Sequence, residues 1–110
     1  MGVSLQLPRI LPVRQAAVRR KIQDLHGRVV TLRAEVAVLD EQIESMDTEV
    51  EELRVRAIVS ETPLAVKEHA EAARHAELAH RARSEYAEEL TRCEAKRDEL
   101  LGELTVEVAS

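Results

Sequence analysis

The sequence predicts an all-α protein: a long antiparallel coiled-coil hairpin of two helices with short extended tails, expected to dimerise into a four-helix bundle. Two observations lead to this fold class. Apolar residues recur at alternating steps of three and four over residues 18–57, which is the spacing of a coiled-coil interface. The composition favours long helices over a globular core, because 34% of the residues are charged and the chain has one Tyr, no Phe and no Trp.

The first helix is expected at about residues 13–59. Its a positions carry Ile, Val or Ala and its d positions carry Leu, Val or Met, as in two-stranded coiled coils. This apolar stripe is only two columns wide, so the helix needs a partner helix to cover it. We call the a and d positions the seam, and on the first helix they are Val18, Ile22, Leu25, Val29, Leu32, Val36, Leu39, Ile43, Met46, Val50, Leu53 and Ala57.

The second helix is expected at about residues 63–101, after a turn at about residues 60–63. Thr62 can cap this helix, and Pro63 suits its first position because proline lacks only an N–H that would be unpaired there. The large seam residues of the second helix are Tyr86, Leu90, Cys93 and Leu100, while alanines take most seam positions nearer the turn. The two helices and the turn form the hairpin, residues 13–103.

Both ends of the chain are expected to be extended. Apolar and polar residues alternate in residues 1–12 and again in residues 104–110, as they do in a strand. Pro8 and Pro12 argue against a helix at the first end, and Gly102 is a plausible helix stop before the second. The first segment lacks the basic region followed by an apolar run that a signal peptide would have.

Charge favours folding the second helix back on the first. Residues 9–33 carry seven Arg or Lys and one Asp, whereas residues 34–61 carry nine acidic and two basic residues. The antiparallel arrangement places the basic half against residues 84–103, which are acidic, and the acidic half against residues 62–83. The alternative is a parallel homodimer through the first helix, which its Ile/Val and Leu pattern also suits. That dimer would place like charges together and leave the second helix without a partner.

The same reflection through the turn places residues that flank the seam opposite each other. Asp40 then faces His80, which is a favourable pair. Arg28 would face Lys96, which is an unfavourable pair.

A third column of the second helix is partly apolar and predicts a further interface. One account of it is homodimerisation into a four-helix bundle, and the other is a docking groove for a different partner. The candidate partner surface consists of Val66, Ala73, His80, Ala87 and Leu101.

The sequence predicts no catalytic, cofactor or metal site, and we expect no enzyme. His75 and His80 are five residues apart, whereas a zinc-binding helix needs two His at i and i+4. The single Cys93 excludes an intrachain disulfide and favours a reducing cytoplasm. A net charge of −5 argues against nucleic-acid binding, and no apolar run reaches the roughly 20 residues that span a bilayer.

One short segment resembles a known family. The residues Lys67-Glu68-His69-Ala70-Glu71 are similar to the KE-x-AE run just after the tip of the N-terminal coiled coil in bacterial Gre transcript-cleavage factors. This resemblance would imply a hairpin that enters the secondary channel of RNA polymerase. The acidic pair that the family uses at its tip to hold magnesium has no clean counterpart, because Glu61 is followed by Thr62 and Pro63.

Two functions therefore remain open. The favoured one is a non-enzymatic coiled-coil structural or adaptor protein of the cytoplasm, which self-associates as a homo-oligomer or docks on a larger protein partner. The alternative is a regulator that inserts the tip of the hairpin into a nucleic-acid machine such as RNA polymerase. Thirteen Arg against three Lys is typical of proteins from GC-rich bacteria.

Overall fold

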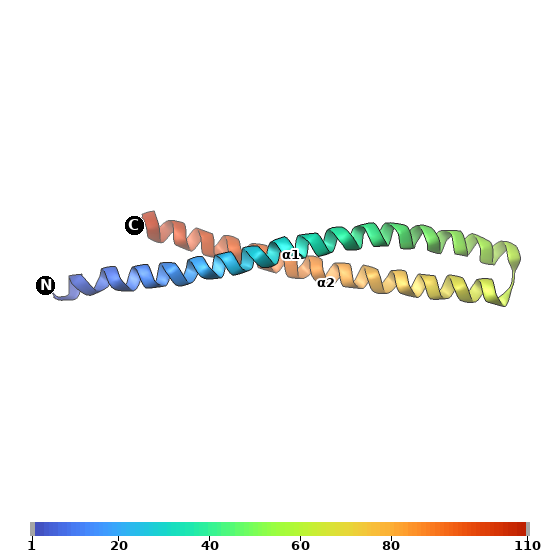
Figure 1. Ribbon diagram of the computed structural model, residues 1–110, viewed down its shortest axis with the longest axis horizontal. Helices are drawn as coiled ribbons and strands as arrows, with labels where there is room; N and C mark the ends of the chain where they lie inside the picture. Colours follow the sequence, from blue (N-terminus) through green and yellow to red (C-terminus); the bar gives the residue numbers. More distant parts are fainter. Residues whose placement is uncertain (1, 110) are drawn as a thin grey trace. The chain divides into compact units, whose positions relative to one another are not determined.

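The computed structural model consists of two α-helices, α1 (Gly2–Ser60) and α2 (Pro63–Ala109), joined by a turn of two residues (Figure 1). It describes residues 2–109, with side chains for residues 13–108. The predicted all-α helical hairpin is confirmed. The chain divides into two compact units: unit 1 comprises Met1–Thr31 and Glu89–Ser110, and unit 2 comprises Leu32–Glu88.

The turn in unit 2 has the capping geometry that the sequence predicts. The hydroxyl of Thr62 accepts a hydrogen bond from the backbone N–H of Ala65 at 3.2 Å, and Pro63 is the first residue of α2. Glu61 adopts a φ of 52°, in the left-handed region, while its N–H still donates to the carbonyl of Ala57 at 3.1 Å. A left-handed residue after the last helical turn is the usual way for a helix to end.

The structure differs from the expectation at both ends of the chain. Residues 2–12 belong to α1 and residues 104–109 belong to α2, and the part of the chain that the structure describes contains no strand. At the second end the reason is visible, because Leu104 and Glu107 continue the seam spacing from Leu100 and are half-buried. The three–four spacing therefore prevails over the two-residue alternation.

Neither the prolines Pro8 and Pro12 nor Gly102 ends a helix. Pro8 and Pro12 lie within α1, although an interior proline removes a backbone donor and crowds the carbonyl four residues earlier; the φ of proline itself fits an α-helix. Gly102 lies inside α2 and has no positive φ, so it does not form the left-handed cap that a helix stop requires.

Exposure along α1 follows the seam. From residue 13 to the end of α1, the side chains that are buried or half-buried are the seam residues and Gln15, and every other one is exposed. On α2 the sheltered set is wider. It includes the seam residues Tyr86, Leu90, Cys93 and Leu100 and also flanking residues such as Glu68 and Ala73. A narrow stripe on α1 thus meets a broader face on α2.

Ion pairs between the helices show the antiparallel direction inside each unit. In unit 1, Arg14 lies 3.1 Å from Glu107, and Arg28 binds both oxygens of Glu89 at 2.9 Å. Residue numbers thus rise on one helix as they fall on the other.

Unit 2 shows the same direction. Nε2 of His80 donates to the carboxylate of Asp47 at 3.0 Å, and Nε of Arg83 donates to Asp40 at 2.9 Å. The expected contact of Asp40 with His80 is therefore replaced. In unit 1, Arg28 likewise meets Glu89 where the sequence suggested Lys96. The simple reflection therefore does not predict which charged residues beside the seam pair with each other.

Candidate functional site

The turn of unit 2 carries a group of exposed apolar side chains. Ile58, Val59 and Leu64 are 60–78% exposed, and two further valines beside them are about half exposed. None of them belongs to the seam, so the pairing of α1 with α2 leaves them uncovered. We call this group the apolar tip, and it consists of Val55, Ile58, Val59, Leu64 and Val66.

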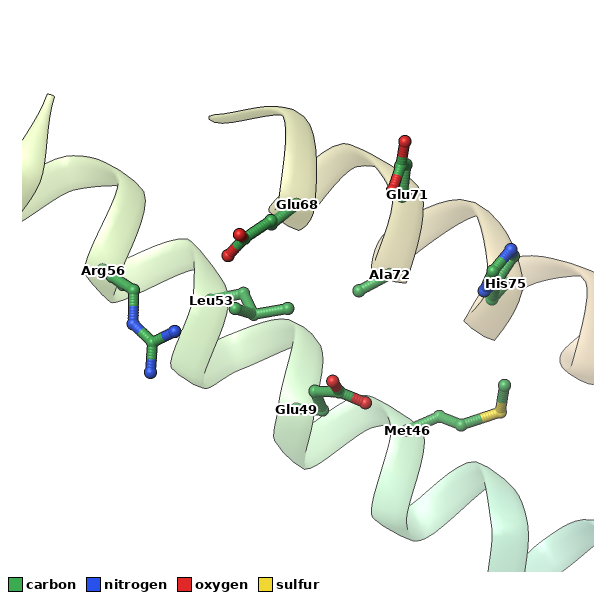
Figure 2. A pocket seen from close by; sticks show the side chains of 8 residues that line it. All are labelled: Met46, Glu49, Leu53, Arg56, Glu68, Glu71, Ala72 and His75. Carbon is green, nitrogen blue, oxygen red and sulfur yellow. The ribbon is translucent and has the colours of Figure 1, made fainter. Parts of the chain in front are cut away.

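A hollow of about 380 Å³ lies between the helices of unit 2, beside the apolar tip. Figure 2 shows Leu53 reaching from α1 toward Ala72 of α2, with Glu68 extending into the same space. The small side chain of Ala72 leaves room that a larger seam residue would fill. The remaining residues of its lining are Met46, Glu49, Arg56, Glu71 and His75.

Carboxylates dominate the charge of this region. Glu49 and Glu68 line the hollow from opposite helices, and they occupy flanking columns in which opposite charges would attract. On the neighbouring face of α1, Arg54 binds Glu51 at 2.7 and 2.9 Å. This hydrogen-bonded pair lowers the pKa of Glu51 below its usual value.

The structure does not make the predicted partner surface of α2 a continuous apolar stripe. Val66 and Leu101 are exposed, but Ala73 and Ala87 are half-buried. His80 is exposed and is held by Asp47. The exposed apolar residues of this surface are therefore Val66 in unit 2 and Leu101 in unit 1. Val66 is also part of the apolar tip.

Polar residues in the seam of α2 reach out to charged neighbours. In unit 2 the guanidinium of Arg83 reaches Asp40. In unit 1 the side chain of Arg97 is 16% exposed, and it donates to Nδ1 of His26 at 3.2 Å and to Asp98 at 3.2 Å. Each arginine keeps its methylene stem along the seam while its charged end finds a partner.

The described residues contain neither a cluster of metal ligands nor a membrane-spanning helix. Among them, no group of three or more His, Cys, Asp or Glu residues lies close enough together to hold a metal ion. No helix in the described part of the chain is long and apolar enough to cross a membrane. Cys93 is a free, half-buried thiol in unit 1.

The sequence interpretation did not identify the apolar tip. Ile58, Val59 and Leu64 adjoin the break between the helices, where apolar residues outside the seam have no partner on the other helix. That position is the signal that could have identified them.

No known protein family, curated protein or solved structure matches the chain. The similarity to Gre factors therefore rests on the residues 67–71 alone.

Proposed function

We propose that this chain is a non-enzymatic structural or adaptor protein that acts through protein–protein interaction. The observation that carries the proposal is the apolar tip, in which Ile58, Val59 and Leu64 are exposed around a single turn. A group of exposed apolar side chains on a small protein usually marks a surface that another protein covers. The partner is a second copy of the chain or a larger protein.

The position of the tip supports this reading. A capped turn with a left-handed residue, Glu61, holds the ends of both helices in one arrangement. Side chains on such a fixed scaffold lose little conformational freedom on binding, which favours affinity. The single half-buried thiol of Cys93 supports our placing of this protein in the reducing cytoplasm.

The test is to make the tip polar and to measure association. The double variant Ile58→Asp, Leu64→Asp should lose self-association in analytical ultracentrifugation, or lose a partner recovered after cross-linking, because charges replace two of the exposed apolar groups of the tip. Leu78→Asp is the matched control, since Leu78 is also exposed in unit 2 but lies on α2 away from the turn. Equal association in all three proteins would contradict the proposal.

The second candidate is the regulator that inserts its tip into RNA polymerase. The carboxylates of Glu49 and Glu68 in the hollow beside the tip favour it, because it requires acidic groups near the end of the hairpin. Binding of the purified chain to purified RNA polymerase, with Glu49→Gln and Glu68→Gln weakening it, would support this candidate. Absence of binding at micromolar concentrations would remove it.

A further inference from the structure

The outer face of α1, opposite its seam, carries a second regular pattern. The c and f positions of the heptad form two adjacent columns there, and all their described side chains are exposed. We divide them by unit. The outer strip of unit 1 consists of Val13, Ala17, Arg20, Asp24, Gly27 and Thr31. The outer strip of unit 2 consists of Ala34, Val38, Glu41, Ser45, Thr48, Glu52, Val55 and Val59.

The two outer strips are complementary when one is laid antiparallel on the other. Val13 then faces Val59 and Ala17 faces Val55, so apolar side chains meet. These contacts keep the three–four spacing of helix–helix packing, in which c and f positions take the roles of a and d.

In the same register Asp24 faces Thr48 and Thr31 faces Glu41, and these pairs are neither apolar contacts nor ion pairs. Arg20 faces Glu52, which places a cation against an anion. Gly27 faces Ser45, so two small residues meet where the helices would approach. The opposite, parallel arrangement in register would place Arg20 against its own copy and Glu52 against its own copy, which is unfavourable.

We propose that the outer strip of unit 1 in one copy docks antiparallel on the outer strip of unit 2 in a second copy. This inference rests on the proposed function and names its partner as the chain itself. Charge complementarity selects that partner, because every copy carries both the strip with Arg20 and the strip with Glu52.

Gly27 provides an independent argument. Glycine inside a helix lowers its stability relative to alanine. No contact among the described residues requires it, because a Cβ added at Gly27 would have no atom within 4 Å apart from the backbone of its own helix. A second helix that packs closely over this point gives the glycine a role, since the absence of a side chain lets two backbones approach.

The first experiment reverses charges. Arg20→Glu and Glu52→Arg should each raise the dissociation constant of self-association about tenfold or more, because each places like charges opposite one another. The double variant restores the attraction with the signs exchanged, so it should recover most of the affinity. Arg19→Glu and Glu85→Arg make the same charge changes at exposed positions outside the outer strips and should have little effect.

Analytical ultracentrifugation over a concentration series measures these constants. Loss in both single variants and recovery in the double variant supports the proposal. A wild-type chain that stays monomeric, or single variants that associate like the wild type, would overturn it. The proposed function fails separately, because Ile58→Asp, Leu64→Asp changes two residues of the apolar tip that lie outside both outer strips.

The second experiment uses steric hindrance. Gly27→Leu should abolish self-association and yet leave the helical circular dichroism of the chain unchanged or higher, since leucine is the better helix former. Gly102→Leu is the matched control, because Gly102 is also exposed in a helix with no atom near its missing Cβ. Gly102→Leu should form an assembly of the same mass as the wild type in analytical ultracentrifugation. Association of Gly27→Leu with wild-type affinity would overturn the antiparallel contact.

Discussion

Unit 1 and unit 2 are built on the same spacing of seam residues but on different side-chain sizes. Unit 2 buries Ala65 and Ala76 of α2 together with Ile43 of α1. Unit 1 buries Leu100 of α2 together with Val29 of α1. In unit 2, α1 contributes large apolar side chains and α2 contributes small ones that allow the two helices to approach closely. In unit 1, both helices contribute large apolar side chains.

The seam of unit 1 is also the more polar. Gln15, Arg97 and Glu107 are half-buried there, and Oε2 of Glu107 is buried without a hydrogen-bond partner. The lesson is that an uninterrupted heptad does not ensure equal packing along its length. We therefore expect unit 2 to be sensitive to changes of size and unit 1 to be sensitive to changes of polarity.

The largest expected effect is the loss of a buried leucine. Leu32 in unit 2 is 0% exposed, so Leu32→Ala should lower the free energy of unfolding by about 2–4 kcal/mol. Leu100→Ala in unit 1 should fall at the lower end of that range, because Leu100 retains 8% exposure. Urea unfolding measures both. Ala34→Ser on the exposed face is the control, and a loss there as large as at Leu32 would show that the seam is misassigned.

A smaller effect is expected when the close approach in unit 2 is disturbed. Ala76→Leu adds volume where alanine is 5% exposed, and overpacking of this kind should destabilise the chain by about 1–3 kcal/mol. Cys93→Leu in unit 1 is the counterpart, because Cys93 is only half-buried and a larger residue can still extend to solvent. Thermal unfolding should separate the two variants. Equal melting temperatures would remove the distinction between the units.

Replacing a polar seam residue of unit 1 with an apolar one should raise the free energy of unfolding. Glu107→Leu removes a buried oxygen that lacks a partner and extends the seam beyond Leu104, so it should stabilise the chain by about 1 kcal/mol. The ion pair with Arg14 is lost, but Arg14 is 61% exposed and such pairs contribute little. Chemical unfolding measures this change in the free energy of unfolding. A destabilised variant would mean that this pair matters more than its exposure suggests.

The smallest expected effect is on pH dependence. The hydrogen bonds from Arg28 hold the pKa of Glu89 below its ordinary value of 4.5. A carboxylate whose pKa is depressed by folding contributes stability above its unfolded pKa, and this contribution is lost as the pH falls through the folded value.

Acid unfolding monitored by circular dichroism tests this pH dependence. Arg28→Gln should reduce the loss of stability below pH 4.5. Arg19→Gln is the control, because it removes an exposed positive charge from unit 1 that forms no ion pair with the described side chains. Identical acid transitions in the wild type and Arg28→Gln would contradict the assignment.

The fold was largely predictable because its signals are local and regular. The seam of α1 follows directly from spacing, and Thr62 with Pro63 marks the start of α2 in both the sequence and the structure. The helical structure of residues 104–109 was not predictable from the alternation of apolar and polar residues. Such a short alternating run also fits a helix, in which Leu104 and Glu107 are half-buried. The apolar tip was missed for a related reason. Periodicity identifies side chains that pack within the chain and gives no signal for those left outside it.

The division of the chain has a kinetic consequence. Unit 2 is one continuous segment, whereas unit 1 is assembled from two segments that the whole of unit 2 separates. The contact of Asp47 with His80 closes 33 residues and that of Arg28 with Glu89 closes 61, so the entropy of loop closure favours the contacts nearer the turn. We expect the hairpin to nucleate at the turn and to close toward its ends. Substitutions in unit 2 should then slow folding, while those in unit 1 should mainly accelerate unfolding.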